Sequence, residues 1–220
     1  MWEQNDKHNY NSSVSRKSGQ IQNDEFSQII REFAKDTRYK SFLEIGTWNG
    51  LGSTKQFADE FAYRTDDYIF YSLECNKDKS TYAKSLYKDN TKIHILNEVI
   101  FNHEPTDFYE IFPQCKLNAM YKRWNDVDMI NMNQCNLFLD RHDLPEIFDV
   151  ILLDGGEFTT YFEFQRLKDK CRYLMLDDIN VDKCTLIVKE IEANPDKWTI
   201  IEKNTTTRNG FMICKNQLKN

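Results

Sequence analysis

The chain has 220 residues, which is enough for one well-buried core but short for two independent domains of ordinary size. Hydrophobic residues make up 40% of it and charged residues 29%, and no apolar run approaches the roughly 20 residues of a membrane helix, so we expect no membrane partner. The net charge of -6 argues against a broad phosphate-binding surface, and we therefore expect no nucleic-acid partner.

The N-terminal segment, residues 1–20, is polar and lacks the apolar stretch of a secretory signal. We expect this segment to be flexible and the protein to be cytoplasmic. The six cysteines lie far apart without a Cys-x-x-Cys pair, which favours free thiols over a disulfide framework or a zinc site. Residues 21–220 are then expected to form a single domain.

Apolar runs of strand length alternate with amphipathic patterns of helical period along most of the chain. After Asp24, apolar residues recur at helical spacing, and SFLEIG at 41–46 then predicts the first strand. The segment 47–63 begins as a glycine-containing loop and continues as a helix. The next elements repeat this alternation, with strands at 68–74, 92–100, 148–155 and 173–179 and helices at 78–87, 159–170 and 182–193.

The alternation stops at residues 101–145, a segment with the size of an insertion. It is rich in aromatic residues and predicts one helix at about 120–140. A connection of this length inside a compact domain is usually a lid or a binding element, so we expect it to help build a binding pocket.

Two strands at 198–204 and 210–216 flank the turn-rich TTTRNG and are expected to pair antiparallel. Repeated strand–helix alternation that ends in such a hairpin predicts an α/β fold. We expect a mostly parallel, seven-stranded sheet with helices on both faces and an antiparallel last strand.

The most informative short motif is FLEIGTWNGLGST, at 42–54. Its glycines Gly46, Gly50 and Gly52 let the backbone turn tightly and approach a ligand closely, and the following helix begins with free amide donors. The spacing G-x-x-x-G-x-G differs from the G-x-G-x-x-G of dinucleotide sites, which favours a nucleoside without a pyrophosphate. Glu74, 28 residues after Gly46, ends the second strand, where a carboxylate can accept both ribose hydroxyls.

With these residues the chain resembles the class I S-adenosylmethionine-dependent methyltransferases, whose first motif reads E-x-G-x-x-x-G, over about residues 24–217. The resemblance implies a Rossmann-like sheet, S-adenosyl-L-methionine as the cofactor, and Glu74 on its ribose. It further implies cofactor contacts from the first loop and the end of the fourth strand, at Glu44, Gly46, Thr47, Trp48, Asn49, Gly50, Ser53 and Asp154. The alternative is that the glycines only form a turn and that Glu74 caps a helix.

Acidic residues also end the fourth and fifth strands. Asp154 follows FDVILL, and Asp177 and Asp178 follow YLML, on strands that should be neighbours. Three carboxylates this close raise one another's pKa values unless a cation or a basic side chain lies among them. A hard divalent ion with oxygen ligands, such as Mg²⁺, meets this requirement.

This arrangement resembles the metal-dependent sugar O-methyltransferases of the macrocin O-methyltransferase type, which have an Asp-Gly segment after strand four and an Asp-Asp pair after strand five. The resemblance implies that Asp154, Asp177 and Asp178 are metal ligands and that Asp154 is catalytic. In such enzymes the metal binds two vicinal hydroxyls and lowers the pKa of the one to be methylated, while a nearby base removes its proton. The chain lacks the family's Gly-Gly turn before strand five, so one aspartate of the pair could cap the next helix instead.

Glu157, three residues after Asp154, is the second catalytic candidate. It can serve as the general base. Alternatively, it begins the helix after strand four, where the helix dipole favours a negative charge.

These observations predict an S-adenosylmethionine-dependent O-methyltransferase that acts on a hydroxyl of a small, carbohydrate-like acceptor with divalent-metal assistance. One alternative is a metal-independent methyltransferase on a protein, lipid or nucleic-acid group, and another is a binding module that keeps the fold without catalysis. The sequence leaves the oligomeric state open, a homo-oligomer included.

Overall fold

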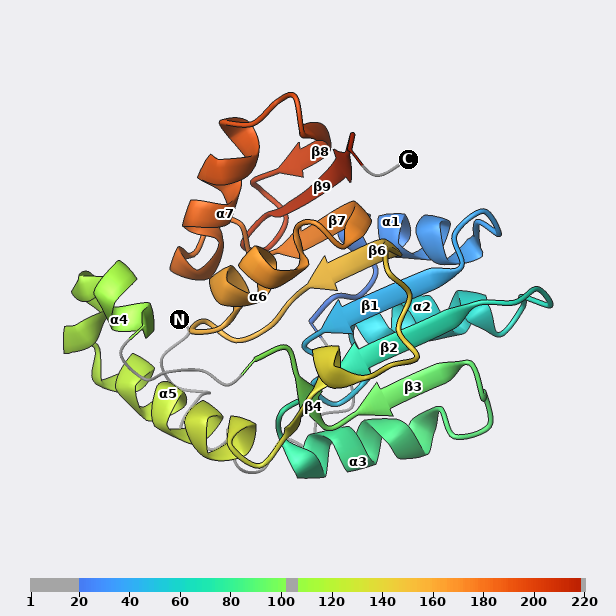
Figure 1. Cartoon of the computed structure of the whole chain (residues 1–220), viewed down its shortest axis with the longest axis horizontal. Coiled ribbons are helices and arrows are strands. Elements are labelled where there is room, and N and C mark those ends of the chain that lie inside the picture. The colour runs from blue at the N-terminus through green and yellow to red at the C-terminus, as the bar shows by residue number, and fades with distance from the viewer. Residues whose placement is uncertain (1–19, 102–106, 219–220) are drawn as a thin grey trace.

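A seven-stranded sheet organises the protein, whose computed structural model describes residues 20–101 and 107–218 (Figure 1). The strand order is β3-β2-β1-β6-β7-β9-β8. All neighbours from β3 to β7 pair in parallel, whereas β9 is antiparallel to both β7 and β8. The predicted mostly parallel sheet with an antiparallel last strand is confirmed. The strands are β1 (Ser41–Ile45), β2 (Ile69–Leu73), β3 (Ile93–Leu96), β6 (Phe148–Leu153), β7 (Cys171–Asp177), β8 (Trp198–Asn204) and β9 (Phe211–Asn216).

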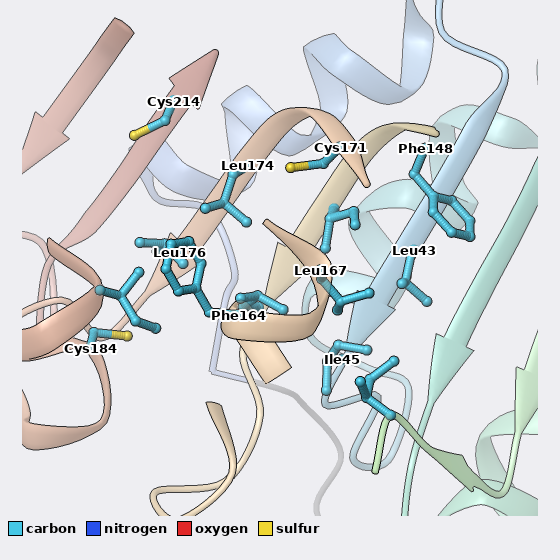
Figure 2. Close-up of a cluster of buried hydrophobic side chains, with 14 of the residues drawn as sticks. Leu43, Ile45, Phe148, Phe164, Leu167, Cys171, Leu174, Leu176, Cys184 and Cys214 are labelled. Carbon is cyan, nitrogen blue, oxygen red and sulfur yellow. The ribbon is translucent and has the colours of Figure 1, made fainter. Parts of the chain in front are cut away.

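Helices cover both faces of the sheet because the central strands are apolar on both sides. In β1, Leu43 and Ile45 belong to one buried cluster and Phe42 to the other, as the two-residue period of a strand requires. Figure 2 shows the first cluster, where Phe164 and Leu167 lie beside these β1 side chains. Two helices contribute to this cluster, α6 (Thr160–Leu167) and α7 (Asp182–Glu192), and three to the opposite one, α1 (Glu25–Lys35), α2 (Ser53–Phe61) and α3 (Lys77–Leu86).

The first helix begins where the sequence predicted. Asp24 accepts a hydrogen bond from the Ser27 amide at 2.7 Å, and Ser27 Oγ accepts one from the Asp24 amide at 2.9 Å, which forms a capping box. The segment 1–20, expected to be flexible, lies outside the described residues except for Gln20. Within the two described ranges, no helix is both long and apolar enough to cross a bilayer.

The strand predicted at 92–100 is wrong in its second half. After β3 the chain leaves the main sheet, and β4 (Glu98–Val99) pairs in parallel with β5 (Asn136–Leu137) from the insertion. The break falls at Asn97, whose side-chain amide donates to the backbone carbonyl of Glu74 at 2.8 Å. This side-chain hydrogen bond to the end of β2 takes the place of further ladder pairing.

The helix predicted at 120–140 is too long, because α5 (Ala119–Met132) ends eight residues earlier. The chain then forms β5 and the 3-10 helix η4 (Phe138–Asp140). Phe138 is fully buried there, with its ring 5.3 Å from that of Tyr71, so burial in the sheet core decides the local structure. The described part of the insertion also holds the short helices α4 (Asp107–Ile111) and η3 (Pro113–Leu117).

Candidate active site

A cavity of about 350 Å³ lies at the carboxyl ends of the parallel strands. In Figure 1 the arrowheads of β1, β2 and β6 point toward the side on which α5 lies, and residues of α5 line the cavity. The residues that line it include the loop after β1, the end of β2 with β4, the loop after β6 and the insertion helix α5. Residues from the end of β7 and from α6 and α7 also line it. This is the edge at which open parallel sheets bind ligands.

The loop after β1 crosses the end of β6 in close contact. Gly46 has a φ of +102°, and a Cβ added there would lie 2.2 Å from the Asp154 carbonyl oxygen, so the position requires glycine. The amides of Gly46 and Thr47 both donate to the Leu73 carbonyl, at 3.0 and 3.1 Å, which fixes the loop to β2. The loop therefore ties β1, β2 and β6 together beside the cavity.

The loop residues predicted to contact a cofactor divide into two groups. Four of them line the cavity, namely Gly46, Thr47, Trp48 and Ser53. Asn49 and Gly50 do not line it. Gly50 instead forms the outer turn with a φ of +74°, where an added Cβ would lie 2.9 Å from that of Ala83, and its carbonyl accepts a hydrogen bond from Tyr87.

Glu74 lines the cavity and is held in a fixed orientation. Its Oε2 accepts the Trp48 amide and its Oε1 the Asn76 amide, both at 2.8 Å. Burial raises the pKa of this carboxyl, and the charge of Lys79 acts in the opposite direction. The alternative that Glu74 caps the next helix does not hold, because Asn76 caps α3 with its own side chain. Oε2 keeps a lone pair for a hydroxyl donor, and Oε1 accepts only a long contact of 3.8 Å from the Cys75 thiol besides the Asn76 amide.

Glu44 is fully buried and lies outside the cavity lining. Its Oε2 accepts hydrogen bonds from Thr54 of α2 at 2.7 Å and from Ser72 of β2 at 2.5 Å. Burial raises its pKa. The contact that Glu44 makes with the site is therefore indirect, through the helix and the strand that support the glycine loop.

The three aspartates predicted to gather do so. Asp154, Asp177 and Asp178 each offer a carboxylate oxygen, and these atoms lie within 4.8 Å of one another. Asp154 and Asp178 line the cavity, whereas Asp177 is buried behind it and forms an ion pair with Arg208. Burial first and Asp178 second raise the pKa of Asp177 to about 6.

Lys183, from the first turn of α7, lies among these acids and was not singled out in the sequence. Its Nζ is 2.9 Å from Asp178 Oδ2 and 3.7 Å from Asp154 Oδ1, and it donates to the Gly155 carbonyl at 3.0 Å. Burial lowers the pKa of Lys183, but Asp178 and Asp154 outweigh it and hold that pKa well above its usual range. The lysine is therefore charged.

The cluster fits this ammonium better than it fits Mg²⁺. Two of the three carboxylates already face Lys183 and the third faces Arg208, so none is left with only a metal to balance it. Carboxylates this close require a cation or a basic side chain among them, and Lys183 is such a side chain.

Two further glutamates line the cavity and keep one buried oxygen each without a hydrogen-bond partner among the described residues. They are Glu157, the predicted base, and Glu163, which sequence reasoning missed. Burial raises the pKa of Glu157, and it raises that of Glu163 to about 7. A carboxylate whose pKa is raised accepts a proton more readily than an ordinary one, which suits a general base.

The insertion forms the wall opposite the sheet. Trp124, Asp128 and Met132 of α5 line the cavity there, and Phe158 joins them from the loop after β6. Phe158 packs edge-on against Phe108 at 4.9 Å, which fixes this wall to α4. The cavity lining thus combines aromatic and acidic side chains and Lys183 with the glycine loop and Glu74.

Replacing Glu163 by Gln tests its buried carboxyl. A folded-state pKa raised to about 7 means that the folded protein holds a proton that the unfolded chain releases. The protonation of this carboxyl therefore makes the free energy of unfolding fall as pH rises from about 4.5 to 7. Urea unfolding should show that Glu163→Gln gains on the order of 2–3 kcal/mol over the wild type between pH 5 and pH 8. An equal difference at both pH values would contradict the raised pKa.

No known family model and no curated protein matches this chain in sequence. Solved structures do match it in fold. The O-methyltransferase from Bacillus cereus in complex with SAH superimposes with a TM-score of 0.54 at 13% identity over 87% of this chain and 80% of that chain. A putative O-methyltransferase from Klebsiella pneumoniae superimposes with a TM-score of 0.56 at 14% identity, over 92% of this chain and 84% of that chain. The O-methyltransferase TomG from Streptomyces achromogenes, in complex with SAM, superimposes with a TM-score of 0.51 at 15% identity, over 87% of this chain and 79% of that chain.

At identities this low, the structural similarity establishes the fold, and the function has to be inferred from the residues of the site. The chain has the Rossmann-like fold of class I methyltransferases.

Proposed function

We propose that the protein transfers a methyl group from S-adenosyl-L-methionine to a hydroxyl of a small acceptor. The observation that carries this proposal is Glu74, which faces the cavity at the end of β2 beside the glycine loop, both oxygens oriented by backbone amides. That placement suits the two hydroxyls of a ribose. The similar structures with bound SAH or SAM support the same type of ligand.

Different residues of the cavity have different roles in this proposal. Glu74 and the loop from Gly46 to Trp48 hold the nucleoside, and Asp154 marks the end where the acceptor meets the reactive group. Bound S-adenosylmethionine supplies a methyl group activated by sulfonium. The Glu157 carboxylate takes the proton of the acceptor hydroxyl while that oxygen bonds to the methyl carbon and the carbon–sulfur bond breaks, which leaves S-adenosylhomocysteine. Alignment of these atoms supplies most of the rate.

A carbohydrate-like acceptor fits the far end of the cavity. Trp124, in front of the buried Phe158, offers an apolar ring beside the carboxylates of Asp128 and Glu163, a combination that suits a sugar ring with its hydroxyl donors. The names of the similar O-methyltransferases favour an oxygen acceptor. Mg²⁺, predicted from the three aspartates, is the alternative source of positive charge, and it requires Lys183 to leave the cluster.

Titration calorimetry with S-adenosylhomocysteine tests the nucleoside site directly. We expect one binding event per chain. Transfer of a labelled methyl group to a panel of polyhydroxylated small molecules then tests the acceptor class. A folded protein that binds no adenosyl ligand would refute the proposal and support a binding module that keeps only the fold.

Asp154→Asn should separate chemistry from cofactor binding. The substitution preserves size and the backbone contact with the glycine loop, but it removes a charge beside Lys183. We expect methyl transfer to fall by about 100-fold or more, with the affinity for S-adenosylhomocysteine changed only a few-fold. Equal losses in both quantities would place Asp154 in nucleoside binding rather than in the reaction.

A further inference from the structure

The Lys183 ammonium is a buried charge, with its side chain only 4% exposed. It lies in the first turn of α7, and a cation in the first turn of a helix is opposed by the helix dipole. Burial also opposes its charge. A lysine kept charged against both effects is held there by Asp154 and Asp178.

We infer that the Lys183 ammonium takes the place of a divalent metal ion at this site and donates a hydrogen bond to the acceptor oxygen. The inference rests on the proposed function and names the residue that replaces the metal predicted from the sequence.

The geometry leaves one donor of Lys183 available. An ammonium has three hydrogens, and within the described residues two of them bond to Asp178 Oδ2 and the Gly155 carbonyl. Asp154 Oδ1, at 3.7 Å, lies beyond hydrogen-bond distance. Because Lys183 lines the cavity, the third hydrogen can reach an acceptor oxygen placed between Asp154 and Glu157.

A metal ion and this ammonium exclude each other. A divalent ion bound to Asp154 and Asp178 would lie within a few ångströms of Nζ, since both carboxylates already face that nitrogen. At such a distance in a buried site, like charges repel strongly. Arg208, which also pairs with Asp24, adds a second positive charge on Asp177, so each carboxylate of the cluster already faces a basic side chain.

The ammonium can do for the reaction what the metal was expected to do. It stabilises the negative charge that grows on the acceptor oxygen as Glu157 takes the proton, and Lys183 keeps all three of its own hydrogens. The oxygen–methyl bond forms as the carbon–sulfur bond breaks. No metal or other co-reactant is needed for this balance.

Manganese titration tests the inference, with Mn²⁺ detected by electron paramagnetic resonance in the presence of S-adenosylhomocysteine. The wild type should bind no stoichiometric Mn²⁺ at millimolar concentration. Lys183→Ala should gain one Mn²⁺ per chain, at least 10-fold tighter than any wild-type binding, because it opens a space next to three carboxylates. Lys183→Met, which keeps the volume but not the charge, should gain weaker binding.

Lys189→Ala is the matched control, since Lys189 is exposed on the same helix, and it should behave as the wild type. Stoichiometric Mn²⁺ binding by the wild type that Asp178→Asn abolishes would overturn the inference, even if neither Lys183 variant folds. A folded Lys183→Ala that binds no Mn²⁺ would overturn it as well. Failure of the proposed function is distinguishable, because it abolishes the binding of S-adenosylhomocysteine itself.

With an acceptor from the panel, wild-type methyl transfer should be unchanged by a chelator. Lys183→Met should lower kcat by about 100-fold while KM for the acceptor changes only a few-fold, since the hydrogen bond strengthens as charge develops on the oxygen. Loss of wild-type turnover on chelation, restored by Mg²⁺, would overturn the inference.

Discussion

Glu74→Ala is expected to weaken the binding of S-adenosylhomocysteine by about 100-fold. The substitution removes a carboxylate placed to accept two ribose hydroxyls, and hydrogen bonds to a charged group contribute about 1.5–3 kcal/mol each. It also leaves the Trp48 and Asn76 amides without their acceptor, which loosens the glycine loop. Titration calorimetry measures the change in affinity.

Two variants make this result interpretable. Glu74→Gln keeps the shape of the side chain and one acceptor oxygen, so its affinity for S-adenosylhomocysteine should fall by only about 10-fold. Asp67→Ala removes an exposed carboxylate that precedes the same strand at its opposite end and should change nothing. Equal affinities for Glu74→Ala and the wild type would show that no ribose lies against this carboxylate.

Gly46→Ala is expected to destabilise the fold by at least about 2–3 kcal/mol. The residue has a φ of +102°, which L side chains rarely adopt, and the new Cβ would lie 2.2 Å from the Asp154 carbonyl oxygen. Because that oxygen belongs to backbone, β1 and β6 must separate at the edge where the site forms. Urea denaturation measures the loss.

Gly156→Ala is the control for the same substitution in the same cavity. An added Cβ there would lie 3.1 Å from a side-chain oxygen of Asp128, which can move, so we expect a change below about 1 kcal/mol. If Gly46→Ala were as stable as Gly156→Ala, the close crossing of the loop over β6 would be wrong.

The order of elements could be predicted from the sequence because apolar runs of strand length are long enough to stand out. The boundaries that failed lie where tertiary contacts override local pattern. Asn97 ends β3 through a hydrogen bond to β2, and Phe138 leaves a helical pattern to fill the core. Neither partner is visible from the local sequence.

The site residues at the ends of strands could be predicted from the sequence, whereas those within helices could not. Asp154 and Asp178 are adjacent to apolar runs, so the topology alone brings them together. Lys183 and Glu163 lie within amphipathic helical patterns, where a charge usually faces solvent. The available signal for Lys183 was its place in a first helical turn, where a cation is unfavourable.

The small sheet of β4 and β5 gives the two ends of the cavity a common support. Val99 of β4 lines the cavity where we propose that the nucleoside binds. Its hydrogen-bonded partner β5 follows α5, whose Trp124 and Asp128 line the cavity where we propose that the acceptor binds. A ligand that settles against β4 therefore also positions α5. We expect a compulsory binding order, with the nucleoside first and the acceptor second, visible in product-inhibition kinetics.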